Sequence, residues 1–227
     1  MSSRPRKPSV IAEGRAEDRV RDRDLVRLYW PVELRPAFDA LFSLDDALAD
    51  VVERAREPTL GAIKLAWWRE RLEELEQDKV PAEPRFRAVA AELLPRGVTG
   101  AALGALTDGW TTLLEAEPDI ERVGESGAIL FAIGAQLLGA SDPRIATAGR
   151  LYRQEQVARR ELMAVHWPMD ELHQLARHRF ATRLRPLTAL AALAARDARR
   201  SLPEPEGTPG RSWTLIRHRF TGKINLD

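Results

Sequence analysis

Asp46 and Asp50 stand four residues apart in the segment LFSLDDALADVVERAREP, which begins at Leu41. On a helix, side chains at positions i and i+4 project from nearly the same face, so these two carboxylates can bind one divalent cation together. Magnesium prefers oxygen ligands and commonly bridges one or two carboxylates to substrate phosphates. The spacing predicts half of a magnesium–diphosphate site, although acidic pairs of this kind also occur on solvated helices.

The residues around the pair have the period of a helix that is buried on most sides. At about 100° per residue, two adjacent apolar stripes cover about half of the circumference, and the remaining arc carries a row of acids. One stripe contains Leu41, Leu44, Leu48, Val51 and Ala55, the second contains Phe38, Phe42, Ala49 and Val52, and the acidic row contains Asp46, Asp50, Glu53 and Glu57. The acids are expected to face either water or a polar cavity, and periodicity does not distinguish the two.

The composition is that of a single folded domain without thiol chemistry. The 227 residues are 44% hydrophobic and 30% charged, which favours one large core. Lysines and arginines number 35 against 34 acids, and the net charge of +1 argues against a dedicated nucleic-acid-binding protein. The absence of cysteine excludes disulfides, thiolate metal sites and a cysteine nucleophile.

The sequence predicts neither a transmembrane segment nor a targeting signal. The longest apolar-rich run, 128–140, is shorter than the roughly 18 residues that a spanning helix needs. The first residues lack the apolar block of a secretory signal, and Glu13, Glu17 and Asp18 argue against an organelle transit peptide. We therefore expect a cytoplasmic protein whose membrane contact, if any, is peripheral.

Helical periodicity runs along most of the chain, without the alternation that is typical of strands. The expected helices cover residues 17–29, 33–56, 58–77, 83–94, 99–115, 120–138, 143–164, 169–179 and 183–201. A disordered, charged arm is expected at 1–16 and one helical domain at 17–202. Residues 203–227 are expected to form a linker, rich in proline and glycine up to 210, and a short terminal segment around 213–220.

The segment DDALADVVERAREPTLGAIKLAWWRERLEEL, residues 45–75, resembles the squalene/phytoene synthase family. In that family a DxxxD helix is followed by a proline, a leucine–glycine turn and a tryptophan-bearing helix. Softer similarity continues through GAILFAIGAQLLG at 127–139, AGRLY at 148–152 and WPMDEL at 167–172. The resemblance extends over residues 18–200, and its first block is the most specific.

The resemblance implies an all-α isoprenoid synthase fold, a helical bundle around a central cavity. Active members are similar in condensing two prenyl diphosphates head to head, with magnesium ions held between two aspartate-rich motifs on facing helices. Asp46 and Asp50 match the first motif residue by residue and are the expected Mg²⁺ ligands. Asp45 precedes them and is expected to support the site from behind.

The second motif departs from the family pattern. Glu155 and Arg159 stand where the family carries two aspartates, and the segment RLYRQEQVARRELMAVHWP, 150–168, contains no aspartate. An arginine at such a position opposes a magnesium cluster by on the order of several kcal/mol at an effective dielectric constant of about 20. Arg153, Arg159 and Arg160 are candidates for binding a diphosphate directly, because guanidinium groups suit phosphate oxygens. The alternative is that they pair with nearby acids or water on a solvated face.

The helix after the aspartates carries a lysine and a tryptophan pair. Lys64 lies between two apolar stripes, where its stem snorkels or its ammonium group reaches a phosphate, and it is a further diphosphate-binding candidate. Trp67 and Trp68 fall on different apolar stripes and are expected in the core rather than in a ligand cage. The spacing of the histidines supports neither a metal site nor a catalytic triad.

Two functions remain open. The loss of the second motif, and of the tyrosine expected near Glu125, resembles the diverged branch of the family that is related to the mitochondrial complex I assembly factor. Such a protein would not be catalytic and would act through protein contacts or by binding an isoprenoid or another lipid, with respiratory complex assembly as one role. The alternative is an active magnesium-dependent prenyltransferase that makes a product of the squalene or phytoene type from two prenyl diphosphates.

Overall fold

The computed structural model describes residues 21–77, 80–200 and 202–226. Across these ranges the regular structure consists of ten α-helices, α2 to α11, and five short 3-10 helices. Arg179 and Lys223 form an isolated β-bridge outside any strand. The all-α fold class is confirmed. The arm predicted for residues 1–16 lies outside the described residues.

The helices follow the predicted segments, with short loops between them. They are α2 Asp22–Arg27, α3 Arg35–Glu53, α4 Pro58–Glu73, α5 Pro84–Glu92, α6 Gly100–Thr111, α7 Ile120–Leu137, α8 Ile145–Arg159, α9 Met169–Arg177, α10 Arg185–Asp197 and α11 Pro209–Thr221. The 3-10 helices are η1 Val32–Leu34, η2 Glu74–Gln77, η3 Leu94–Arg96, η4 Thr112–Leu114 and η5 Thr182–Leu184. No helix among the described residues is long and apolar enough to cross a membrane.

Local sequence determines where several helices begin. Pro58 and Pro84 occupy the first turns of α4 and α5, where the missing N–H group is tolerated. The side chains of Asp119 and Thr208 accept hydrogen bonds from backbone N–H groups in the first turns of α7 and α11. These features are visible in the sequence, which explains why most of the predicted boundaries lie near the observed ones.

Helix α8 ends earlier than predicted. The expected helix reached residue 164, whereas α8 ends at Arg159. Two residues later, Glu161 has a φ of 57°, in the left-handed region that terminates helices. Arg159 and Arg160 therefore stand at the helix end, where their side chains can reach α3 and α10.

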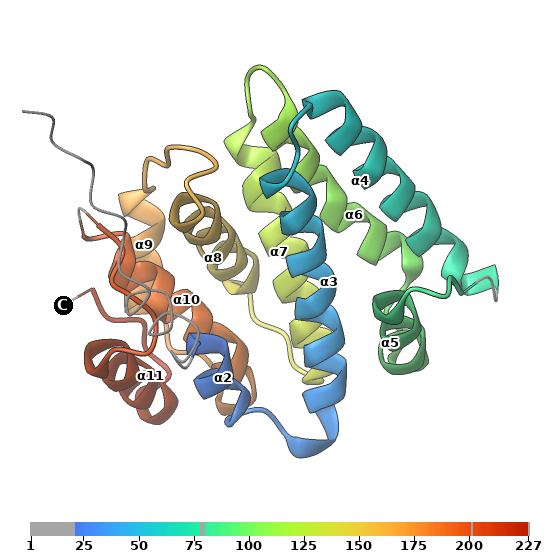
Figure 1. Cartoon of the computed structure of the whole chain (residues 1–227). Helices are drawn as coiled ribbons and strands as arrows, with labels where there is room; N and C mark the ends of the chain where they lie inside the picture. Colours follow the sequence, from blue (N-terminus) through green and yellow to red (C-terminus); the bar gives the residue numbers. More distant parts are fainter. Residues whose placement is uncertain (1–20, 78–79, 201, 227) are drawn as a thin grey trace, which may run out of the picture.

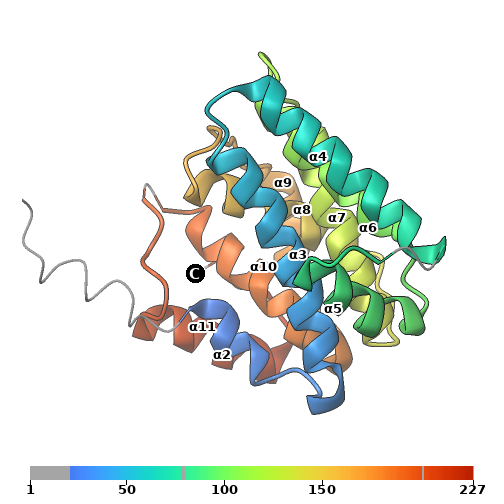
Figure 2. The same ribbon diagram turned by 45° about the vertical axis from the view of Figure 1, so that its right-hand side comes forward.

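Neighbouring helices pack in the order α4, α6, α7, α8, α10 and α11, as the ribbon in Figure 1 shows. Helix α3 packs against α4, α5, α6 and α7, and α2 packs against α10 and α11. The turned view in Figure 2 shows α2 beside α11 and α3 between the α4 and α10 sides of the molecule. The aspartate-bearing helix α3 is thus central in the fold.

Two glycines bring α7 and α8 into close contact. A Cβ atom on Gly127 would lie 2.3 Å from the backbone oxygen of Gly149, and a Cβ on Gly149 would lie 2.2 Å from that of Gly127. Separations this short exclude any side chain, so the two backbones pack directly on each other. This contact positions the part of α8 that carries Glu155 and Arg159.

Aromatic side chains pack on one another along α3. Trp30 stacks on Phe38 and Phe42, with ring centroids 4.4 and 5.5 Å apart. Tyr152 of α8 contacts Phe42 edge-on, with ring centroids 6.3 Å apart. Such pairs add to the hydrophobic stabilisation of a core, and here they join α3 to α8.

The prediction for the tryptophan pair of α4 is confirmed for one residue and wrong for the other. Trp68 is buried and stacks on Phe86, with ring centroids 4.6 Å apart. Trp67 is 43% exposed, because it lies at the outer side of the same helix and contacts Phe86 only edge-on.

The C-terminal segment is longer than predicted and is part of the core. Helix α11 spans 13 residues and begins at Pro209, inside the stretch predicted to be a linker. It packs on α10 and α2 and buries Arg211, Leu215 and His218. The segment predicted around 213–220 did not include Arg211, and the sequence did not indicate that this helix packs into the core.

Candidate functional site

A cleft of about 700 Å³ opens between α2, α3 and α8, with α10 and the start of α11 at its edge. Its apolar wall includes three aromatic rings and two leucines, from Trp30, Phe42, Tyr152, Leu190 and Leu193. The cleft lies between helix α3, which carries the aspartate motif, and α8, which carries the second-motif positions.

The charged part of the cleft is rich in arginine. The described lining residues include eight arginines and seven acids. The arginines are Arg21, Arg23, Arg27, Arg54, Arg85, Arg159, Arg160 and Arg211. The acids are Asp22, Asp24, Asp39, Asp46, Asp50, Glu155 and Glu206. Magnesium ions bind through carboxylate oxygens together with substrate phosphates. In this lining the carboxylates do not outnumber the guanidinium groups.

Helix α3 presents both Asp46 and Asp50 to the cleft, and both are paired with guanidinium groups. The Nη2 atom of Arg23 lies 2.5 Å from Oδ2 of Asp46, and Nη2 of Arg160 lies 3.2 Å from Oδ1 of the same residue. Asp50 forms an ion pair with Arg54 at 3.1 Å. Both carboxylate oxygens of Asp46 therefore already accept a hydrogen bond from an arginine of the protein.

Asp45 points away from the cleft and belongs to a buried ion pair. Its carboxylate accepts two hydrogen bonds from Arg153, at 2.5 and 2.9 Å, and one from Nε1 of Trp110 at 3.1 Å. The guanidinium group of Arg153 also stacks over the Trp110 ring at 4.3 Å. Asp45 was expected to support the aspartate motif, and it instead joins α3 to α6 and α8.

Two of the four diphosphate-binding candidates line the cleft, and the other two lie outside it. Arg159 and Arg160 line the cleft, and Arg160 also pairs with Glu53. The side chain of Arg153 is 0% exposed and is paired with Asp45. A diphosphate in the cleft therefore cannot reach this guanidinium group. Lys64 is exposed on α4, outside the residues that line the cleft.

The second-motif positions, Glu155 and Arg159, are paired with each other. Nε of Arg159 donates to Oε1 of Glu155 at 2.6 Å, and Nη2 of Arg159 also binds Asp197 of α10. Burial and the neighbouring Asp197 raise the pKa of Glu155 to about 7, against the opposing effect of Arg159. At these positions the structure therefore has a buried carboxyl group with a raised pKa and a guanidinium group.

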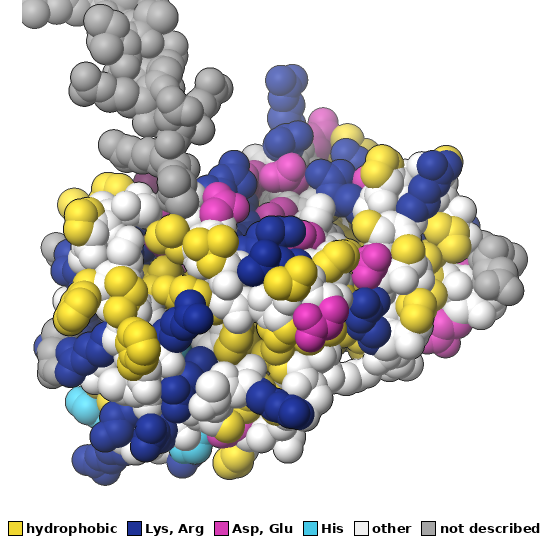
Figure 3. All heavy atoms as spheres, turned by 90° about the horizontal axis from the view of Figure 1, so that it is seen from below, with side chains coloured by type: hydrophobic (Ala, Val, Ile, Leu, Met, Phe, Trp, Pro, Cys, Tyr) yellow, Lys and Arg dark blue, Asp and Glu magenta, His cyan; other side chains and the backbone are white. Residues whose placement is uncertain are grey.

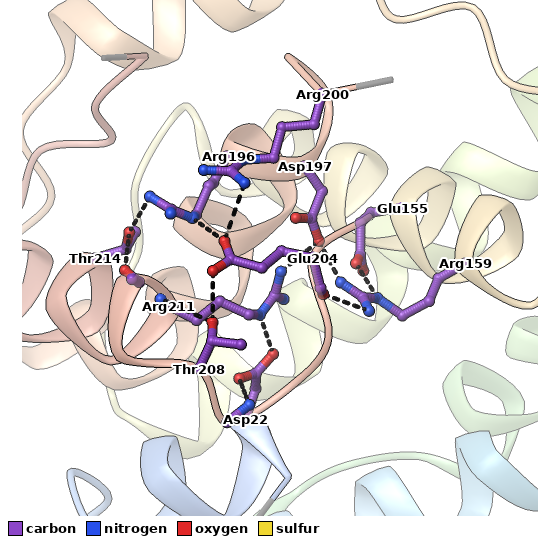
Figure 4. Close-up of polar contacts among 12 residues, drawn as sticks. Asp22, Glu155, Arg159, Arg196, Asp197, Arg200, Glu204, Thr208, Arg211 and Thr214 are labelled. Carbon is purple, nitrogen blue, oxygen red and sulfur yellow. Dashed lines mark hydrogen bonds and ion pairs between the residues drawn. The ribbon is translucent and has the colours of Figure 1, made fainter. Parts of the chain in front are cut away.

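Figure 4 shows that this pair is one end of a larger charged network. Arg211 of α11 donates to Asp197 and to Asp22 of α2, each at 2.6 Å, and the backbone N–H of Gly207 donates to Asp22 at 3.1 Å. The carbonyl oxygen of Glu204 accepts a hydrogen bond from Arg159 at 3.0 Å. The network joins α2, α8, α10 and α11 at the edge of the cleft.

Sequence reasoning missed the contribution of α2 to the site. Arg23 and Arg27 line the cleft, and Arg23 pairs with Asp46. The alternating run RVRDRD at 19–24 was a visible signal of concentrated charge. Its position opposite α3 could not be inferred, because pattern alone does not say which helices pack together.

The carboxylates of the cleft do not form a metal-binding cluster. Across the described ranges, no group of three or more His, Asp or Glu side chains is arranged to hold a metal ion. The residues around Asp46 and Asp50 thus do not fit the magnesium set that the resemblance implies. The guanidinium groups of the same cleft fit phosphate oxygens, which they can bind with two parallel hydrogen bonds.

An all-α fold with an aspartate-bearing helix on the wall of a cleft is consistent with a protein of the isoprenoid synthase-like class. Residues 18–122 match the family model for squalene/phytoene synthase. The match includes Asp46 and Asp50 and ends before α8, so the second-motif positions lie outside it. The predicted similarity up to residue 200 is therefore confirmed only for the first part. No curated protein and no solved structure matches the chain.

Proposed function

We propose that the protein is a diverged, non-catalytic family member that binds a prenyl diphosphate or a similar anionic lipid in the cleft without magnesium. The observation that carries this proposal is the pairing of the first aspartate motif with arginines. Arg23 and Arg160 contact Asp46, and Arg54 contacts Asp50. These guanidinium groups stand next to the carboxylates where magnesium ions would have to bind.

Electrostatic repulsion supports the same proposal. Two unit charges 4 Å apart interact by about 4 kcal/mol at an effective dielectric constant of 20, and a divalent ion doubles that energy. An ion at Asp46 would lie close to both Arg23 and Arg160, which are themselves within 3.2 Å of the carboxylate. A diphosphate would be attracted by the guanidinium groups of Arg23 and Arg160, which supports an anionic ligand next to them.

The apolar wall of the cleft supports a ligand with a hydrocarbon chain. Aromatic rings and leucines line it, and its volume of about 700 Å³ is in the range that small-molecule sites occupy. A ligand with a diphosphate head and an apolar chain would match both kinds of lining. A role in respiratory complex assembly, which the resemblance implies, would add a protein partner to this lipid-binding function.

The proposal is tested by measuring the binding of farnesyl diphosphate with and without magnesium. In a calorimetric titration with EDTA present, the full chain should bind farnesyl diphosphate. Arg160→Ala should weaken this binding about tenfold or more, because it removes a charge-assisted contact to phosphate. Lys64→Ala, which changes an exposed cation outside the cleft, should leave the affinity unchanged. Binding that requires magnesium, or an equal loss in both variants, would contradict the proposal.

An active prenyltransferase is the second candidate, because Asp46 and Asp50 both face the cleft. This function predicts magnesium-dependent release of diphosphate from farnesyl or geranylgeranyl diphosphate. The release should disappear in the Asp46→Ala/Asp50→Ala double variant. Detecting such a reaction, with a hydrocarbon product, would replace the non-catalytic proposal by the catalytic one.

A further inference from the structure

Helix α11 has an apolar face that no described part of the chain covers. Trp213, Ile216 and Phe220 recur at helical spacing and are 65%, 40% and 74% exposed. The opposite face of the helix is in the core, where Leu215 and His218 are buried. Large exposed apolar groups that gather on one surface mark sites of interaction with a protein or a membrane.

Exposed apolar side chains also occur in the segment that includes the end of α2 and η1. Leu28 and Val32, at the end of α2 and in η1, are 62% and 70% exposed. Helix α2 packs on α11, and the guanidinium group of Arg219 lies 4.5 Å from the ring centroid of Tyr29. Exposed apolar side chains therefore also stand in the segment after α2, which contacts α11 through Tyr29.

Basic side chains border this surface. Arg217, Arg219 and Lys223 are exposed on α11 and directly after it, and α11 contains no acid. Nε of Arg179 donates to the carbonyl oxygen of Thr221 at 2.9 Å, which holds a further arginine at the helix end. Figure 3, seen from below, shows hydrophobic and Lys or Arg side chains interspersed over its left half, with acids toward the centre and right.

We propose that the face formed by Trp213, Ile216 and Phe220 binds an anionic membrane surface. Aromatic residues favour the interface between acyl chains and headgroups, and flanking arginines and lysines attract anionic lipids. A second copy of the chain would bring the same positive charges to the contact and would be repelled. Charge complementarity therefore favours anionic lipid over a symmetric dimer, and the inference does not depend on any ligand in the cleft.

Flotation of the full chain with lipid vesicles tests this inference. The protein should float with vesicles of mixed phosphatidylcholine and phosphatidylglycerol, and not with phosphatidylcholine alone. Added salt should weaken the binding, because it screens the basic side chains. The Trp213→Ser/Phe220→Ser double variant should bind about tenfold less or weaker still, because it removes the inserting side chains.

The matched control is the Leu60→Ser/Ile63→Ser double variant, which changes side chains of 60% and 61% exposure on α4. This variant should float like the unchanged protein. Arg217→Glu/Lys223→Glu keeps the apolar face and should lose the preference for anionic vesicles, and thermal unfolding shows whether each variant is folded.

Three results would overturn the inference: no flotation of the unchanged protein, equal flotation with neutral vesicles, or equal loss of binding in the α4 control. A dimer of the unchanged protein that the Trp213→Ser/Phe220→Ser variant loses in lipid-free chromatography would also overturn it. That outcome would assign the face to a second copy of the chain.

Discussion

Two adjacent aspartates of α3 have opposite environments. Asp45 has a side chain with 1% exposure and binds the fully buried Arg153, whereas Asp46 is one-third exposed at the cleft. On a helix, consecutive side chains differ in direction by about 100°, so one residue can face the core while its neighbour faces a cavity. Asp45 therefore supports the packing of α3, whereas Asp46 faces the cleft.

Asp45→Ala should be strongly destabilising. The substitution leaves the guanidinium group of Arg153 buried without its carboxylate, and breaking a buried pair in this way costs about 3–5 kcal/mol. Asp46→Ala is the matched control, because its ion pairs are partly exposed and should contribute about 1 kcal/mol or less. Urea unfolding of both variants measures the difference. Equal destabilisation by the two substitutions would show that the Asp45 pair does not support the fold.

At the scale of elements, the α7–α8 contact determines how close the second-motif helix lies to the rest of the cleft. Gly127 and Gly149 each stand where a Cβ atom would collide with the other residue's backbone oxygen. Gly124, one turn earlier on α7, faces the flexible side chain of Arg150, 3.3 Å from a Cβ placed there. Of these three glycines, Gly127 and Gly149 are required for the close packing of the two backbones, whereas Gly124 is not.

Gly127→Ala should destabilise the protein by about 2 kcal/mol or more, because the helices must separate to accept the methyl group. Gly124→Ala should be neutral or stabilising by up to about 1 kcal/mol, since alanine is the better helix former and the Arg150 side chain can move. Thermal unfolding of the two variants tests this pair of predictions. A stable Gly127→Ala protein would contradict the direct backbone contact between α7 and α8.

At the scale of the whole molecule, a charged network joins the first and last described helices. Arg211 of α11 links Asp22 of α2 to Asp197 of α10, and Arg159 continues the network to Glu155 of α8. Oδ1 of Asp197 is buried and has no hydrogen-bond partner among the described residues. A network of this kind depends on the protonation of its members, because desolvated charges interact strongly.

Stability should fall as the pH rises through the titration of Glu155. Its pKa is raised from 4.5 to about 7, so between these values the folded protein holds a proton that the unfolded chain has lost. The contribution of Glu155 to the free energy of unfolding is therefore fully present below pH 4.5 and is lost by about pH 7. By linkage its size is on the order of 3 kcal/mol at most.

Glu155→Gln isolates this effect, because glutamine does not titrate. The free energy of unfolding of the unchanged protein, relative to that of the variant, should decrease between pH 4.5 and 7. His218 has the opposite dependence, since burial lowers its pKa from 6.5 to about 4 and its contribution is lost as the pH falls. His218 is present in both proteins and cancels in the difference. A difference that stays constant with pH would show that Glu155 is ionised in the folded protein.

The sequence predicted most helices because their signals are local. Apolar periodicity, first-turn prolines and side-chain caps act within a few residues, so α3, α4 and α7 lie close to their predicted bounds. The end of α8 and the length of α11 were predicted less well. Both depend on a left-handed residue or on packing against distant helices, and neither leaves a clear pattern in the local sequence.

The sequence by itself determined the helical fold class, the similarity of residues 18–122 to the squalene/phytoene synthase family and the DxxxD pair, because these follow from residue types at short spacing. Only the tertiary structure decided what those aspartates contact. It places Arg23 of α2 and Arg160 of α8 on Asp46, and it buries Arg153 against Asp45. The physical reason is that an ion pair between residues far apart in the chain depends on how helices pack, and charge patterns do not specify that packing.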